Sequence, residues 1–265
     1  MMDQSAIHRF AVALAKEAGL MLMDSLTQNI AAEYKTSAAD LVTEMDRKIE
    51  CFFAEKVNTE FPEHMILGEE GTVTDQRSYI PEEETVWLID PIDGTTNFVH
   101  QKRNFAISVG VYHKGSPIAG VIFDPAEGEC FHALSGEGAW LNETKLERLS
   151  PTSEEEALIA MNSLWLVPNE YADFEKMQSL VSKVRGVRCQ GSAALELAHV
   201  ACGRLDGSIA FGLGPWDFGA GLVLLKEVGA VVTTSGNDSI YPFDHSSVIA
   251  AKPGLHEILA ASYLR

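Results

Sequence analysis

The chain has 265 residues, of which 46% are hydrophobic, enough to bury a substantial core in one large domain or two interlocked lobes. Its formal charge of −18, from 20 basic and 38 acidic residues, would repel a nucleic-acid backbone, so we expect no nucleic-acid partner. The N-terminus lacks the uninterrupted apolar stretch of a signal peptide, and the apolar runs are too short to span a bilayer. These features favour a cytoplasmic protein without a membrane partner.

Two helices are predicted at the start of the chain. Apolar residues recur at helical spacing from Ile7 to Leu22 and form one stripe over several turns. A second helix is predicted over about 40–58, with Asp40 as its cap. Asp46 then lies two turns into that helix, either as a surface charge or as an acid held close to apolar neighbours.

Short β-rich runs follow the two helices, and short turns between them favour antiparallel pairing. These runs cover 65–67, 86–89, 105–112, 118–123 and 130–134. After a polar stretch at 150–156, strands and helices alternate, over 158–161, 171–184, 192–201, 205–211, 215–228 and 230–234. We therefore expect an N-terminal α+β lobe over 1–150 and a C-terminal α/β lobe over 151–265.

Two aspartates, Asp90 and Asp93, come directly at the end of an apolar strand. Pro91 stiffens the chain between them and Gly94 permits unusual backbone angles, so both carboxylates could face one cavity. If Thr95 opens a short helix, the backbone N–H groups of Gly94 and Thr95 would suit an anion such as phosphate. An ordinary turn after a buried strand explains the same residues equally well.

Further acids follow other apolar segments. Glu69 and Glu70 come just after the apolar run 65–67, where a solvated loop is the simpler interpretation. Asp217 lies near the start of an apolar helix, where it could merely complement the helix dipole. The small residues at 219–221 would let that helix approach another element closely, as a shared metal site requires.

Four separated motifs combine these residues. They are Asp40-Leu41-Val42-Thr43 through Asp46, Gly68-Glu69-Glu70, Asp90-Pro91-Ile92-Asp93-Gly94-Thr95-Thr96-Asn97-Phe98 and Pro215-Trp216-Asp217. In order and spacing the set resembles the inositol monophosphatase family, part of the lithium-sensitive, magnesium-dependent phosphatase superfamily that includes fructose-1,6-bisphosphatase. The resemblance implies a mixed α and β fold, a layered α-β-α-β-α sandwich of the sugar-phosphatase type. It also implies an antiparallel sheet in the N-terminal lobe, a mixed sheet in the C-terminal lobe, and a homodimer.

The resemblance implies two to three magnesium ions in each active site. Glu69, Asp90 and the Ile92 carbonyl would bind one ion, and Asp90, Asp93 and Asp217 a second. A weaker third ion would rest largely on Glu69. Carboxylate and carbonyl oxygens are the hard ligands that magnesium prefers.

The resemblance further implies hydrolysis of a phosphate monoester by metal-activated water, without a covalent intermediate. Thr95 paired with Asp46 would orient the water, and Glu70 would support the water network. The amides of Gly94 and Thr95 would neutralise charge on the phosphate.

Substrate contacts are implied for Asp93, Gly94, Thr95, Gly191, Ser192, Ala193 and Asp217. Lys35 would guide the anionic substrate inward, or is simply a solvated lysine. Ala210 stands where inositol-specific relatives carry a glutamate that binds ring hydroxyls, which argues against strict specificity for inositol. We expect inositol monophosphate or a similar small sugar or polyol phosphate as the substrate. Fructose-1,6-bisphosphatase, nucleotide-3′-phosphatase and NADP phosphatase activities are the alternatives, and a non-catalytic regulatory protein of this fold is a more remote one.

Overall fold

The computed structural model describes residues 3–27, 32–34, 41–71 and 84–264. The first part of the chain forms α1 (Gln4–Ser25), β1 (Ala32–Tyr34), β2 (Leu41–Thr43), α2 (Glu44–Glu60), β3 (Met65–Gly68), β4 (Thr85–Asp93), α3 (Thr95–His100), β5 (Ala106–His113), β6 (Ser116–Asp124), β7 (Glu129–Leu134), β8 (Gly138–Leu141) and β9 (Thr144–Lys145). The second part forms β10 (Leu158–Met161), the 3₁₀ helix η1 (Ser163–Leu166), α4 (Phe174–Val181), β11 (Gly186–Arg188), α5 (Ala193–Ala201), β12 (Gly207–Leu213), α6 (Pro215–Val228), β13 (Val231–Thr233), β14 (Ser246–Ala251) and α7 (Leu255–Ser262).

The first large sheet has seven strands in the order β3-β4-β5-β6-β7-β8-β9. Pairing is antiparallel from β4 to β9, as predicted from the short turns. The prediction of an antiparallel sheet is wrong at one edge, because β3 pairs parallel with β4. The physical reason is the length of their connection, residues 69–84, since parallel neighbours need a long crossover and antiparallel ones only a turn.

Helix α1 confirms the first predicted helix. Asp3 begins it by accepting a hydrogen bond from the Ala6 N–H at 3.0 Å. Its apolar stripe packs against strands β5, β6 and β7 and is buried at Ile7, Ala11, Leu14, Ala18 and Leu22. Burial of this stripe against the sheet contributes most of the stability of such an amphipathic helix.

Helix α2 begins later than predicted. The N-cap is Thr43 and the first helical residue is Glu44, whereas the predicted cap, Asp40, lies outside the described residues. Asp46 therefore occupies the third helical position rather than the second turn. Its carboxylate and Thr43 form a capping box, which sets the start of the helix at this point. It is fully buried, so the interpretation of Asp46 as a surface charge is wrong.

The second large sheet has five strands in the order β11-β10-β12-β14-β13. Strands β11 and β12 pair parallel with β10, while β14 pairs antiparallel with β12 and β13. This confirms the mixed sheet expected for the C-terminal half. The prediction from residue pattern covered β10, β12 and β13 and missed β11, β14 and α7.

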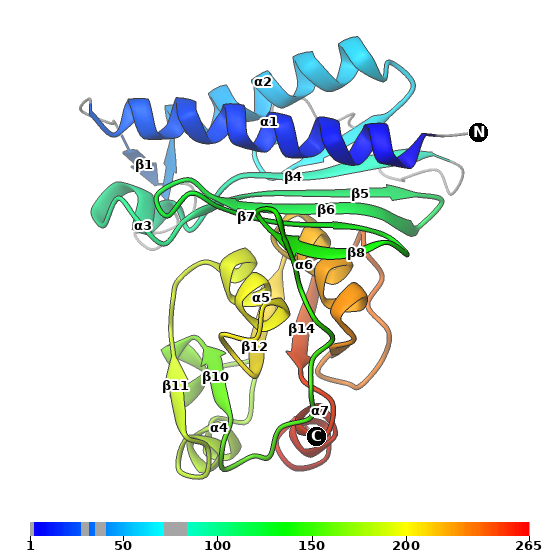
Figure 1. The fold of residues 1–265 in the computed structure, drawn as a ribbon. Coiled ribbons are helices and arrows are strands. Elements are labelled where there is room, and N and C mark those ends of the chain that lie inside the picture. The colour runs from blue at the N-terminus through cyan, green and yellow to red at the C-terminus, as the bar shows by residue number, and fades with distance from the viewer. Residues whose placement is uncertain (1–2, 28–31, 35–40, 72–83, 265) are drawn as a thin grey trace.

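Five layers result (Figure 1). Helices α1 and α2 cover one face of the seven-stranded sheet, and α5 and α6 lie between the two sheets. Helices α4 and α7 cover the far side of the five-stranded sheet, where they share a core cluster with β10, β12 and β14. The predicted α-β-α-β-α sandwich is confirmed. The predicted lobe boundary near residue 150 stays a prediction.

Within the described residues, none of the helices combines the length and the apolarity needed to cross a lipid bilayer.

Candidate active site

A bulge at the end of β4 turns Asp90 and Asp93 toward one space. In a regular strand, residues three apart point to opposite faces of the sheet. Here Asp90 is opposite Ser108 and Asp93 is opposite Ala106, so β4 has one residue more than β5 in this stretch. The extra residue reverses the alternation after Asp90, and the two carboxylates share a side.

Asp217 reaches the same place from helix α6. Pro215 occupies the first turn of α6, and Asp217 is its third residue. Its Oδ2 accepts a hydrogen bond from the Gly214 N–H at 2.7 Å, which fixes the side chain at the helix start. Carboxylate oxygens of Asp90, Asp93 and Asp217 lie within 4.8 Å of one another.

Burial and the charges of neighbouring acids raise the pKa of all three carboxyls. Burial raises the pKa of Asp90 well above its ordinary value, and the charges of Glu69, Asp93 and Asp217 raise it further. The pKa of Asp217 is raised well above its ordinary value by burial and by the charges of Asp93 and Glu69. Burial likewise raises the pKa of Asp93 to about 6, although hydrogen bonds from Ser192 and Ala194 oppose the shift. Such a cluster of buried like charges is stabilised by a cation.

The donor atoms of the cluster fit magnesium. All three side chains offer carboxylate oxygens, the hard ligands that Mg²⁺ selects, and no histidine or cysteine belongs to this group. The cluster contains Asp90, Asp93 and Asp217, the residues assigned to one ion from the family resemblance. Glu69 lies outside this trio but close enough to raise the pKa of Asp90.

The loop that carries Glu69 and Glu70 is held by Glu50 of helix α2. The buried Glu50 Oε2 accepts a hydrogen bond from the Glu70 N–H at 2.7 Å. A Cβ at Gly68 would lie 2.4 Å from the same oxygen, so a larger residue there would displace the Glu50 carboxylate that holds the loop. The Glu69 N–H donates to the Ile89 carbonyl at 3.2 Å. The predicted solvated loop is thus a half-buried, anchored turn.

Asp46 and Thr95 meet beside the cluster. Asp46 Oδ2 accepts hydrogen bonds from the Thr43 N–H and the Thr43 hydroxyl, both at 2.7 Å. The Thr95 hydroxyl lies 3.3 Å from Asp46 Oδ1 and 3.0 Å from the Ile92 carbonyl, and can donate to either. Thr95 opens the short helix α3 as predicted, after Gly94 in a left-handed conformation with φ of 91°.

The start of helix α5 holds Asp93. Its Oδ2 accepts hydrogen bonds from the Ser192 hydroxyl and from the Ala194 N–H, the latter at 2.7 Å. Gly191 precedes this helix with φ of 77°, and a Cβ at Gly94 would lie 3.0 Å from the Gly191 carbonyl. The segments 93–95 and 191–194 are therefore in close contact.

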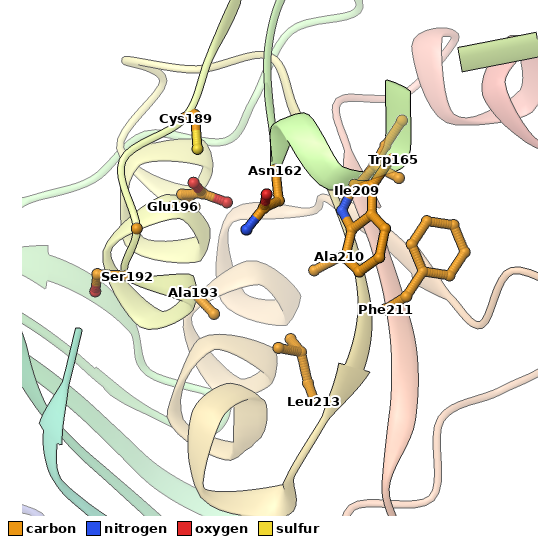
Figure 2. A pocket seen from close by; sticks show the side chains of 11 residues that line it. Asn162, Trp165, Cys189, Ser192, Ala193, Glu196, Ile209, Ala210, Phe211 and Leu213 are labelled. Atoms are coloured by element: carbon orange, nitrogen blue, oxygen red, sulfur yellow. The ribbon is translucent and has the colours of Figure 1, made fainter. Parts of the chain in front are cut away.

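A cavity of about 280 Å³ opens beside this contact. Helix α5 forms one wall, and β12 with η1 forms the other (Figure 2). Three residues expected to touch substrate, Gly191, Ala193 and Ala210, line it. Ser192 lines it too, but its hydroxyl points away from the other lining side chains (Figure 2) and donates to Asp93. Lys35 lies outside the described residues.

Three positions that matter here were missing from the sequence prediction. Glu50 lies four residues after Asp46, which places both acids on one face of a helix, and this spacing could have indicated it. Asn97 joins two parts of the site, because its Nδ2 donates to the Asn104 and Gln190 carbonyls at 2.8 and 2.7 Å. Glu196 lines the cavity, but a single glutamate in an apolar helix gives no sequence signal of that kind.

Comparison with known proteins identifies the family of this chain. A model of the inositol monophosphatase family matches residues 3–264. The Bacillus subtilis (strain 168) inositol-1-monophosphatase is 44% identical over 264 residues, covering 100% of this chain and 98% of the relative.

Two solved structures show the same fold. The crystal structure of inositol monophosphate-bound SaIMPase-II has a TM-score of 0.87 and 34% identity, covering 98% of this chain and 93% of that one. An IMPase/NADP phosphatase complexed with Mg²⁺ and phosphate has a TM-score of 0.89 and 25% identity, covering 100% and 99%. The resemblance read from four motifs is confirmed, and the chain belongs to the inositol monophosphatase family.

Proposed function

We propose that this phosphatase hydrolyses the phosphate monoester of inositol or of a similar small sugar or polyol, with Mg²⁺ held by Asp90, Asp93 and Asp217. The observation that carries the proposal is the convergence of these carboxylates within 4.8 Å, from a strand and a helix far apart in sequence. Glu69 and the Ile92 carbonyl would complete the ligand set for two to three ions. Bound magnesium would supply positive charge to the phosphate oxygens and increase the acidity of a water molecule.

Thr95 and Asp46 are placed to orient the attacking water. Asp46 is fixed by two hydrogen bonds from Thr43, so its remaining oxygen meets the Thr95 hydroxyl in a set direction. When Thr95 donates to Asp46 or to the Ile92 carbonyl, its oxygen can accept a hydrogen bond from water and align a lone pair of that water with phosphorus. Glu70, anchored through its N–H by Glu50, would join the same water network.

The phosphate would lie against the start of helix α3. The first N–H groups of a helix have no partners within it, so those of Gly94 and Thr95 suit phosphate oxygens. Direct attack by water needs no nucleophilic side chain. The residues described here would instead hold the metal ion, orient the water and neutralise charge on the phosphate.

The substrate assignment rests on the relatives. The Bacillus subtilis relative is an inositol-1-monophosphatase, and SaIMPase-II has been solved with inositol monophosphate bound. The third relative is an IMPase/NADP phosphatase, which supports NADP phosphatase activity as the alternative. From the family resemblance we also infer a lithium-sensitive homodimer, and from the charge of −18 an absence of nucleic-acid partners. We further infer a cytoplasmic location.

Replacing Asp93 with asparagine tests the function. Asp93→Asn keeps the shape of the side chain but weakens one metal ligand, so magnesium-dependent release of phosphate from inositol 1-phosphate should fall at least about a hundred-fold, the cost of losing several kcal/mol of charge stabilisation. Phosphate release at saturating magnesium is the measurement.

The matched control is Asp124→Asn. Asp124 is also a buried aspartate, and its Oδ1 accepts hydrogen bonds from backbone N–H groups away from the cluster. This variant should retain turnover. Undiminished turnover in Asp93→Asn would refute the assignment, and a wild-type protein that releases no phosphate would favour a non-catalytic role.

A further inference from the structure

The cavity beside the aspartate cluster contains a hydrogen-bond donor that the protein does not pair. Trp165, in η1, is 9% exposed and lines this cavity. Among the described residues, its indole Nε1 has no hydrogen-bond partner. Buried polar groups in native proteins are nearly always paired, so an unpaired donor in a cavity wall is open to pairing with an ordered water or with a ligand that binds there.

The indole ring is fixed by its neighbours. Phe211 packs edge-on against Trp165 with ring centroids 5.0 Å apart and an interplanar angle of 73°. Tyr171 packs edge-on as well, at 5.7 Å and 68°. With aromatic rings packed on it in this way, the indole holds one orientation. Figure 2 shows its nitrogen on the cavity side of the ring, toward Asn162.

The other polar groups of the cavity surround the same space. Asn162 Oδ1 accepts a hydrogen bond from the Leu164 N–H at 2.9 Å, which sets the orientation of the Asn162 amide. The Glu196 carboxylate faces Asn162 from helix α5 on the opposite wall (Figure 2). Between these groups the walls are apolar, from Ala193, Ala210 and Leu213. The cavity therefore has one hydrogen-bonding edge and one apolar face.

This cavity is joined to the cluster through Ser192. The residue lines the cavity, and its hydroxyl donates to Asp93. If the phosphate of the substrate lies at the cluster, as in the proposed function, the alcohol portion of the substrate lies in the cavity. With alanine at position 210, the β12 part of the cavity wall carries no charge, and the Trp165 indole and the Asn162 amide are the polar groups on that side.

We propose that Trp165 is a specificity-determining residue, whose indole N–H donates a hydrogen bond to an oxygen or nitrogen of the substrate's alcohol portion. The inference rests on the proposed function for the position of the phosphate. The substrate class is the phosphate ester of a ring alcohol that places one face against Ala210 and Leu213 and an acceptor atom against Trp165. Cyclitol and nucleoside phosphates share this chemistry. At about 280 Å³ the cavity is slightly smaller than the roughly 300–1,000 Å³ typical of drug-sized ligands, so it suits one or two rings.

The test compares substrates that differ in the acceptor. Inositol 1-phosphate and adenosine 2′-monophosphate carry acceptor atoms, whereas cyclohexyl phosphate has a ring with none. In Trp165→Phe, the kcat/KM of each acceptor-bearing substrate relative to cyclohexyl phosphate should fall about ten-fold, the size of one net hydrogen bond, and mainly through KM. A fall for one acceptor-bearing substrate identifies the natural class, and a fall for both supports shared recognition.

An unchanged ratio for both substrates would overturn the role of Trp165, because loss of a purely structural tryptophan would change the kcat/KM of all three substrates by the same factor. Trp140→Phe is the matched control, because Trp140 lies in β8 beside His132, away from the cavity, and its ratios should not change. If Trp165→Phe does not fold, β-(3-benzothienyl)alanine at position 165 keeps the ring shape and removes only the donor. A wild-type enzyme that hydrolyses none of the three esters contradicts the proposed function itself.

Discussion

Three acids of the site each satisfy the backbone at the start of a helix. Asp46 accepts the Thr43 N–H at the start of α2, Asp93 accepts the Ala194 N–H in α5, and Asp217 accepts the Gly214 N–H before α6. In each case one oxygen is held by backbone N–H groups. The carboxylate is thereby oriented before any substrate arrives, which is the preorganisation that a catalytic site requires.

Each of these acids both accepts a backbone N–H and belongs to the site, and the sequence could not predict this combination. From the sequence, complementing the helix dipole and binding metal were competing interpretations of Asp217, and Asp46 was either a surface charge or a buried acid. The structure shows that capping does not compete with a place in the site, because a carboxylate has two oxygens. Residue types identified the acids, but only the bulge in β4 and the neighbouring helix starts decide where each oxygen points.

Glu196 provides a prediction about pH at this scale. Burial raises its pKa from 4.5 to about 7, with the charge of Asp93 adding to the shift. Between these pH values the folded chain binds more protons than the unfolded chain, so stability falls as pH rises through that window. Above pH 7 the cost is about 3 kcal/mol.

Glu196→Gln removes this ionisation. The melting temperature of the variant minus that of the wild type should therefore increase from pH 4 to pH 8, measured without divalent cations. A difference that is the same at both pH values would show that Glu196 ionises equally easily in the folded and unfolded chains.

At the scale of elements, helix α6 lies unusually close to the seven-stranded sheet. A Cβ at Gly120 of β6 would be 2.4 Å from the Ala220 carbonyl oxygen, and one at Gly110 of β5 would be 2.8 Å from Gly219. The Tyr112 hydroxyl donates to the Gly219 carbonyl at 2.7 Å. The small residues of α6 were recognised in the sequence, but the matching glycines on the strands were not, because pairing between distant elements has no local signal.

Gly120→Ala should therefore disturb both stability and activity. The added methyl group forces α6 away from β6, at a cost of about 1–3 kcal/mol in the free energy of unfolding. Since α6 carries Asp217, phosphate release should fall as well. Denaturant unfolding and turnover are the measurements, with Ser116→Ala at the exposed start of the same strand as the control. A variant as stable and active as the wild type would contradict this account of the close contact.

At the scale of the whole molecule, the aspartate cluster connects layers that different parts of the chain build. Asp90 and Asp93 belong to the seven-stranded sheet, and Asp217 to the helical layer between the sheets. The family resemblance implied this layered arrangement, whereas residue patterns alone missed β14 and α7. These elements are short, and their apolar residues are stabilised mainly by packing with the rest of the C-terminal core, which local sequence patterns do not reveal.

Magnesium should consequently stabilise the whole fold. At a hundred times its Kd, the ion should raise the free energy of unfolding by about 2.7 kcal/mol, because it binds the folded chain and not the unfolded one. The increase in melting temperature with magnesium should be clear in the wild type and in Asp124→Asn, and small in Asp217→Asn. An equal increase in Asp217→Asn would show that α6 takes no part in binding the ion.

The distribution of the cluster along the chain also bears on how the enzyme is made. Asp90 and Asp93 are synthesised in the first half of the chain. Asp217, at the start of α6, is synthesised much later, in the C-terminal part of the chain. A nascent chain whose seven-stranded sheet has already emerged from the ribosome therefore lacks one acid of the cluster and the helical layer that covers the sheet. Release of phosphate should begin only once α6 has left the exit tunnel, so that premature termination yields inert fragments rather than a partly active hydrolase.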